Sequence, residues 1–97
     1  MQRDDILRVL KRFKRLNADR YNIVRLGLFG SGARDICEEE SDIDVVVVLN
    51  KPNMFNLVGI KQDLEKQFQR HVVDIVRYRD KMNPFLKKRI EKEAVYV

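Results

Sequence analysis

Apolar residues recur every three or four positions near the start of the chain, and basic side chains lie between them. This spacing places the apolar positions on one side of a helix. The repeating positions are Ile6, Val9, Leu10, Phe13 and Leu16. The pattern therefore predicts an amphipathic helix over residues 3–17, with the apolar stripe in the core and the exit at Asn17-Ala18-Asp19.

Two more helices are predicted from shorter stripes and from residues suited to helix starts. One face of a helix over residues 54–69 carries the apolar residues Leu57, Ile60, Leu64 and Phe68, and Asn53 is a plausible N-cap. Asn83-Pro84 combines a capping residue with a proline at the first helical position. A third helix is therefore expected to start there.

Four segments show the composition or alternation of strands. Residues 22–29 alternate apolar residues with polar or small ones. Residues 42–49 are rich in valine on both faces, which favours a central position in a sheet. Residues 71–78 contain the apolar residues Val72, Val73, Ile75 and Val76, interrupted by Asp74, and residues 94–97 are suited to a short final strand.

This order of elements predicts an α/β (α+β) fold, with a small mixed sheet and helices packed mainly on one face. The 97 residues are expected to form a single domain over positions 1–97. The longest apolar run, Val45 to Leu49, is far shorter than the roughly 20 residues that cross a bilayer. One cysteine, Cys37, excludes an internal disulfide. These features favour a cytoplasmic protein without a membrane partner.

The net charge of +5 is unevenly distributed. Basic residues gather at positions 8–20 and in the C-terminal stretch, and acids gather at 35–44. A basic surface can attract a polyanion, but few aromatic residues interrupt these clusters. Solvated helix faces are therefore the favoured interpretation, and nucleic-acid binding is the weaker alternative.

The candidate chemistry begins at Gly30-Ser31, directly after the first strand. Glycine allows a ligand close to the backbone, and exposed N–H groups in such a turn bind anionic oxygens. The Ser31 hydroxyl adds a donor, and Arg34 can form a planar fork with a phosphate. The P-loop and dinucleotide fingerprints are both absent, because their glycine and lysine positions are not matched.

Three carboxylates form the second part of the pattern. Asp42 and Asp44 are one residue apart, so their side chains point to the same face of a strand. Asp74 interrupts an apolar strand, where a buried carboxylate needs a partner or a metal. If the two strands adjoin, the carboxylates converge and are suited to Mg²⁺, which shares phosphate oxygens and keeps waters. The competing interpretation is three unconnected surface acids.

The succession Gly30-Ser31-x-Ala33-Arg34, Ser41-Asp42-x-Asp44 and Asp74 resembles the signature of the DNA polymerase β-like nucleotidyltransferase superfamily. The short chain resembles its minimal branch (MNT), the antitoxin partners of HEPN-domain toxins. The resemblance implies two Mg²⁺ ions on Asp42, Asp44 and Asp74, and ATP on Gly30, Ser31 and Arg34. Asp74 would also act as the base. Asp35 departs from the pattern, because it replaces the usual glycine after the arginine.

The function implied by this resemblance is Mg²⁺-dependent transfer of AMP from ATP to a hydroxyl of a partner HEPN toxin. The acceptor would be a tyrosine, and the chain would act as a type VII-like antitoxin and protein adenylyltransferase. The alternative is an antitoxin of weak or no activity that neutralises its toxin by binding alone. The sequence leaves open the acceptor residue, the number of nucleotides transferred, the base preference and whether homo- or hetero-oligomers form.

Overall fold

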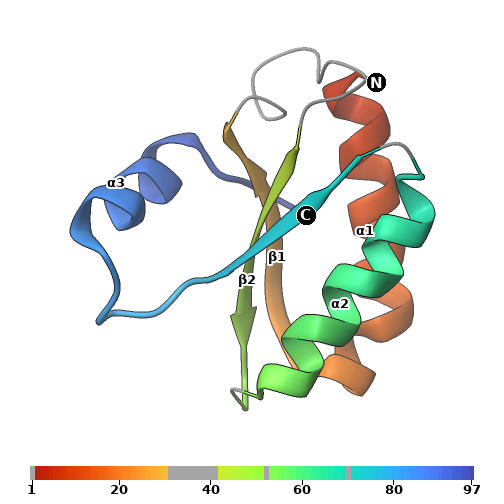
Figure 1. The fold of residues 1–97 in the computed structure, drawn as a ribbon, viewed down its shortest axis with the longest axis horizontal. Coiled ribbons are helices and arrows are strands. Elements are labelled where there is room, and N and C mark those ends of the chain that lie inside the picture. Colours follow the sequence, from red (N-terminus) through yellow and green to blue (C-terminus); the bar gives the residue numbers. More distant parts are fainter. Residues whose placement is uncertain (1, 31–41, 52, 70) are drawn as a thin grey trace.

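The computed structural model describes residues 2–30, 42–51, 53–69 and 71–97. These segments contain helices and strands intermixed along the chain, with β1 followed by β2 (Figure 1). They are α1 (Arg3–Tyr21), β1 (Ile23–Phe29), β2 (Ile43–Leu49), α2 (Met54–Gln67), β3 (Val73–Arg77), α3 (Pro84–Glu93) and β4 (Val95–Tyr96). No helix within the described segments combines the length and the apolar character needed to cross a membrane.

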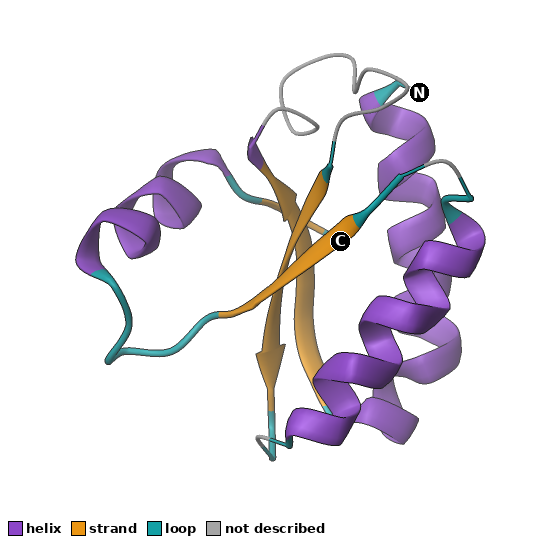
Figure 2. Ribbon diagram, viewed as in Figure 1, coloured by secondary structure: helices purple, strands orange, loops and turns teal. Residues whose placement is uncertain are grey.

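The strands, orange in Figure 2, form a mixed sheet, and their order is β3-β2-β1-β4. β2 pairs antiparallel with β1 and parallel with β3, while β4 adds antiparallel to the outer side of β1. The valines of β2 explain its central place, because Val45 and Val47 face one layer and Val46 faces the other. The predicted mixed α/β fold and the central second strand are confirmed.

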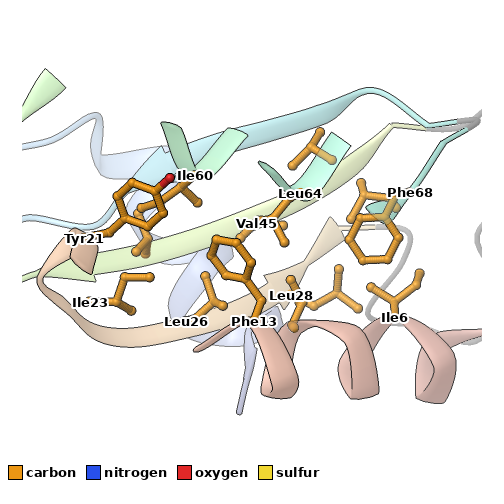
Figure 3. Close-up of a cluster of buried hydrophobic side chains, with 14 of the residues drawn as sticks. Ile6, Phe13, Tyr21, Ile23, Leu26, Leu28, Val45, Ile60, Leu64 and Phe68 are labelled. Atoms are coloured by element: carbon orange, nitrogen blue, oxygen red, sulfur yellow. The ribbon is translucent and has the colours of Figure 1, made fainter. Parts of the chain in front are cut away.

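The main core lies between the sheet and the pair α1 and α2 (Figure 3). Leu26, Val45 and Leu64 are fully buried there, and each such side chain contributes about 1.5–3 kcal/mol. α3 lies on the opposite face, where Ile90 packs with Phe29 and Val46 in a smaller cluster. Two helices therefore share one face, as the sequence predicts, and α3 covers part of the other.

The predicted exit of the first helix is wrong. α1 continues to Tyr21 and ends at Asn22, which adopts the left-handed conformation with φ 57°. The continuation is stabilised from outside the helix, because the buried Tyr21 ring stacks on Phe13 and its hydroxyl donates to Asp63 on α2. The stripe is also shorter than predicted, since Leu16 is 64% exposed.

Both predicted asparagine caps are present. The side-chain oxygen of Asn53 accepts a hydrogen bond from the Phe55 N–H at 2.8 Å, so α2 begins where expected. Asn83 accepts from two N–H groups at the start of α3, and Pro84 occupies the first helical position. These bonds satisfy donors that have no partner inside a helix.

Candidate functional site

The parallel pairing of β2 with β3 brings Asp44 and Asp74 side by side, as partners in the strand register. Residues paired in neighbouring strands direct their side chains to the same face of the sheet. That face is the one covered by α3, because Val46, two residues beyond Asp44, packs against Ile90 of α3. Asp42 precedes β2 and is exposed.

The three carboxylates act on one another electrostatically. Burial raises the pKa of Asp44, the neighbouring Asp74 raises it further, and Asp42 adds a smaller increase. Burial also raises the pKa of Asp74, together with the charge of Asp42 and a hydrogen bond to the Asp42 side chain. The strand register therefore pairs Asp44 with Asp74, and the charge of Asp42, just before β2, acts on both.

Asp74 is less buried than its place in an apolar run indicates. Its side chain is half-buried, and none of the described polar or charged residues is fully buried. The reason is topological, since β3 is the outermost strand and leaves one side of Asp74 open. Partial burial, together with the like charge of Asp42, is the feature that marks this residue.

Gly30 follows β1 directly, beside Asp44, and has φ +74°, a conformation that favours glycine. A methyl group on its Cα would overlap the carboxylate oxygen Oδ2 of Asp44 and lie 3.2 Å from the guanidinium of Arg89. Only glycine therefore fits between the strand end and this carboxylate. Ser31, Arg34 and Asp35 lie outside the described residues.

Arg89 and Glu93 of α3 belong to the site, although the sequence gives no local sign of it. Glu93 Oε2 accepts from the backbone N–H of Gly30 at 3.2 Å and from Arg89 Nε at 3.3 Å. The positive charge of Arg89 lowers the pKa of Asp44 and opposes the effect of burial. Their spacing of four residues predicts an ion pair on a helix, but not its contact with β1.

Lys61 of α2 supplies a second cation that the sequence reading missed. Its charge lowers the pKa of Asp74, while Glu65, one turn further along, raises it. Lys61 and Arg89 line an open cavity of about 480 Å³, together with Asp44 and Asp74. Carboxylates and cations from four elements therefore surround one cavity that is large enough for a phosphate chain.

The acids suit a hard cation in type, but they form an incomplete cage. Within the described segments, no group of three or more His, Cys, Asp or Glu side chains is placed to hold a metal ion. Mg²⁺ commonly binds through one or two carboxylates and takes its other ligands from water and substrate phosphates. The donors present at Asp44 and Asp74 fit that mode of binding.

Residues 6–97 of the chain match the family model of the nucleotidyltransferase domain. The chain belongs to the nucleotidyltransferase domain family. The predicted membership, including its minimal branch, is confirmed.

Relatives and solved structures agree with this assignment. The chain is 34% identical over 96 residues to the Methanocaldococcus jannaschii protein named "Putative protein adenylyltransferase MJ1379", covering 96% of this chain and 95% of that one. A solved structure described as a "putative minimal nucleotidyltransferase" has a TM-score of 0.79 and 28% identity, covering 98% and 95% of the two chains.

A more distant structure shares the fold alone. It is described as a tri-AMPylated Shewanella oneidensis HEPN toxin in complex with MNT antitoxin. Its TM-score is 0.70 at 18% identity, and the match covers 97% of this chain and 70% of that one. This nucleotidyltransferase thus has the same arrangement of strands and helices as a chain of a toxin–antitoxin complex.

Proposed function

We propose that this nucleotidyltransferase transfers AMP from ATP to a tyrosine hydroxyl of a partner HEPN-family toxin, and that the modification neutralises the toxin. The observation that carries the proposal is the register pairing of Asp44 with Asp74 beside the Gly30 turn. A carboxylate pair next to a phosphate-binding turn is suited to in-line phosphoryl transfer. Two Mg²⁺ ions, held by Asp42, Asp44 and Asp74, are part of the proposal.

The reaction forms a bond between the acceptor oxygen and the α-phosphorus of ATP, and it breaks the bond from that phosphorus to the bridging oxygen. Pyrophosphate leaves. Bound Mg²⁺ would supply charge neutralisation at the phosphates and a lower pKa for the acceptor hydroxyl. Asp74 accepts the hydroxyl proton, while Gly30, Ser31 and Arg34 orient the triphosphate.

Support for a protein acceptor comes from the relatives. A protein 34% identical to this chain is named a protein adenylyltransferase, and a chain of the same fold accompanies a tri-AMPylated HEPN toxin. The cavity beside Asp44 is walled by β2, β3, α2 and α3, together with Phe29 of β1. A partner protein would supply the remaining wall and bring its hydroxyl to the phosphate.

The test combines this chain with a candidate HEPN protein, ATP labelled on the α-phosphate, and Mg²⁺. Label should appear on the partner with the parent chain, and it should disappear with Asp42→Asn. Asp19→Asn serves as the matched control, because Asp19 is exposed on α1, on the other side of the sheet. Label that persists in Asp42→Asn would refute the proposed site.

The alternative is neutralisation by binding alone. It is favoured by three large apolar side chains at the starts of α2 and α3: Met54, Phe55 and Phe85 are 78%, 86% and 84% exposed. Such residues commonly lie in protein interfaces. Toxin inhibition that survives Asp42→Asn without any label would establish this alternative.

A further inference from the structure

The site is laid out in a line across the sheet. The Gly30 turn ends β1, Asp44 lies on β2, and Asp74 lies on β3, which is the outermost strand on that side. A triphosphate held at the Gly30 turn therefore approaches the carboxylates from the β1 side. The acceptor has to approach from the opposite side, beyond β3.

A groove leads away from Asp74 in that direction. The cavity beside Asp44 and Asp74 shares three lining residues with a second cavity of about 500 Å³. The shared residues are Leu57, Ile75 and Val76. The two cavities thus form one groove along β3, bounded by α2 and, at its Asp74 end, by α3. In Figure 2, β3 crosses in front of the other strands, between α2 and α3.

The chemistry of the groove changes along its length. Its middle is apolar, and the exposed side chains of Val58 and Met54 stand on its α2 wall. Its far end holds Arg77 and Arg79. Neither arginine forms an ion pair with any residue in the described segments. Within the described lining, the acids are Asp44 and Asp74 alone, at the near end.

We propose that this acceptor groove binds an extended segment of the partner protein that carries the hydroxyl to be modified. The aromatic hydroxyl lies at Asp74, apolar side chains cover Leu57 and Val76, and an acidic side chain pairs with Arg77 and Arg79. Asp74 and Arg77 are three residues apart on β3, or about 10 Å, so their side chains point to opposite faces of the sheet at its outer edge. An extended segment along this edge alternates in the same way, so its hydroxyl-bearing residue and its acid are separated by about three positions. This inference rests on the proposed transfer to a protein.

The charges along the acceptor groove favour an acidic segment of a partner protein over a nucleotide base. The negative phosphates of a nucleotide at the Gly30 turn would lie near the positive charge of Arg89. Arg77 and Arg79 lie beyond Asp74, on the far side of the site. The free edge of β3 adds backbone groups that an extended segment can pair with. An acidic, partly apolar peptide satisfies all three features at once.

The experiment measures peptide binding to the full chain by fluorescence anisotropy, without relying on turnover. The probes are labelled synthetic peptides with one tyrosine, two intervening apolar residues and two glutamates, made in both sequence orders. Matched peptides carry lysine in place of glutamate. The protein variants are the double charge reversal Arg77→Glu/Arg79→Glu and the single change Val58→Asp. Arg12→Glu/Arg15→Glu on α1 is the control.

The acidic peptide should bind the parent at least five-fold more tightly than the lysine peptide. Arg77→Glu/Arg79→Glu should reverse that preference, Val58→Asp should weaken binding of both peptides, and the α1 control should change neither. Affinity for a fluorescent ATP analogue should stay within two-fold in Arg77→Glu/Arg79→Glu and in the α1 control, whose changed residues lie outside the cavity beside Asp44. Thermal melting verifies that each variant is folded.

Any of three results would refute the proposed acceptor groove. They are no binding at millimolar peptide, peptide binding that does not depend on Arg77 and Arg79, or variants that lose affinity for the nucleotide instead of the peptide. Labelled ATP and a HEPN protein then separate the two proposals. Charge-dependent peptide binding without any AMP transfer would refute the transfer and leave the groove standing. Transfer that is unaffected by the groove variants would refute the groove alone.

Discussion

At the scale of single residues, the carboxylate of Asp44 destabilises the fold that carries it. Burial and Asp74 raise its pKa above the ordinary value of 3.8. A carboxyl with a raised pKa in the folded state contributes stability while it is protonated, and this contribution is lost as pH rises through the folded pKa. At neutral pH the charged side chain is therefore a cost that a cation would offset on binding.

We expect Asp44→Asn to be more stable than the parent at pH 7 and inactive in transfer. Solvent screening of this half-buried group limits the gain to below about 1 kcal/mol, or up to about 5 °C in Tm. The gain should shrink as pH falls toward 3.8, because the parent then also becomes neutral at this position. Thermal melts at pH 7 and pH 4 measure this. A variant that melts lower at pH 7, or that retains turnover, would contradict the prediction.

Among substitutions that add only one methyl group, the replacement of Gly30 by alanine should cause the largest loss of stability. Alanine at φ +74° is strained, and its methyl group would overlap the Asp44 carboxylate. We expect Gly30→Ala to lose about 1–3 kcal/mol of stability and most of the nucleotide affinity. Denaturant titration in both parent and Asp44→Ala backgrounds tests the cause. The loss should be smaller where the carboxylate is already gone, and an equal loss would show that backbone strain alone is responsible.

At the scale of elements, the sequence pattern correctly predicted the features that depend on contacts within one segment of the chain. The asparagine caps and the valine-rich central strand follow from side chains acting on their own segment. α1 runs past its predicted exit because Tyr21 is held by Phe13 and Asp63, and the bond to Asp63 spans 42 positions of sequence. Contacts at that separation leave no periodic trace in the sequence.

The same distinction applies to the site. The Asp-x-Asp spacing and the interruption at Asp74 are visible in the sequence, and the register of β2 with β3 then places these acids together. The contact of Glu93 with Gly30 spans 63 positions, and the charge of Lys61 acts on Asp74 from α2. The positions of Glu93 and Lys61 at the site depend on how α3 and α2 pack against the sheet. The apolar stripes of these helices do not determine that packing.

α3 is the element expected to open most readily. It packs through a small cluster around Ile90, whereas α1 and α2 share the main core. Asn83→Ala removes an oxygen that accepts from two N–H groups, which should cost about 1 kcal/mol. Hydrogen exchange should then accelerate in α3 and at the Gly30 amide, which Glu93 holds. Asn53→Ala is the control on α2, and equal acceleration in both helices would contradict a separately opening α3.

At the scale of the whole molecule, the site lies near the β3 edge of a thin fold and is open on one side. The principal extents are 32 × 29 × 19 Å, and the cavity is bordered by half-buried or exposed side chains such as Asp74, Val58 and Lys61. An acceptor in solution would have to meet the α-phosphate without being held in line with it. Fixing that geometry is a large part of the catalysis of transfer between two substrates.

The isolated chain should therefore transfer AMP poorly to small acceptors. We expect turnover with tyramine, a free phenol, to be at least about 100-fold below that with a partner protein, because orientation is lost. Release of labelled pyrophosphate measures both reactions, and Asp44→Asn gives the background rate. Adding the acidic tyrosine peptide should recover part of the difference, since it fills the acceptor groove without a folded partner. Rapid transfer to tyramine would show that the chain positions an acceptor unaided.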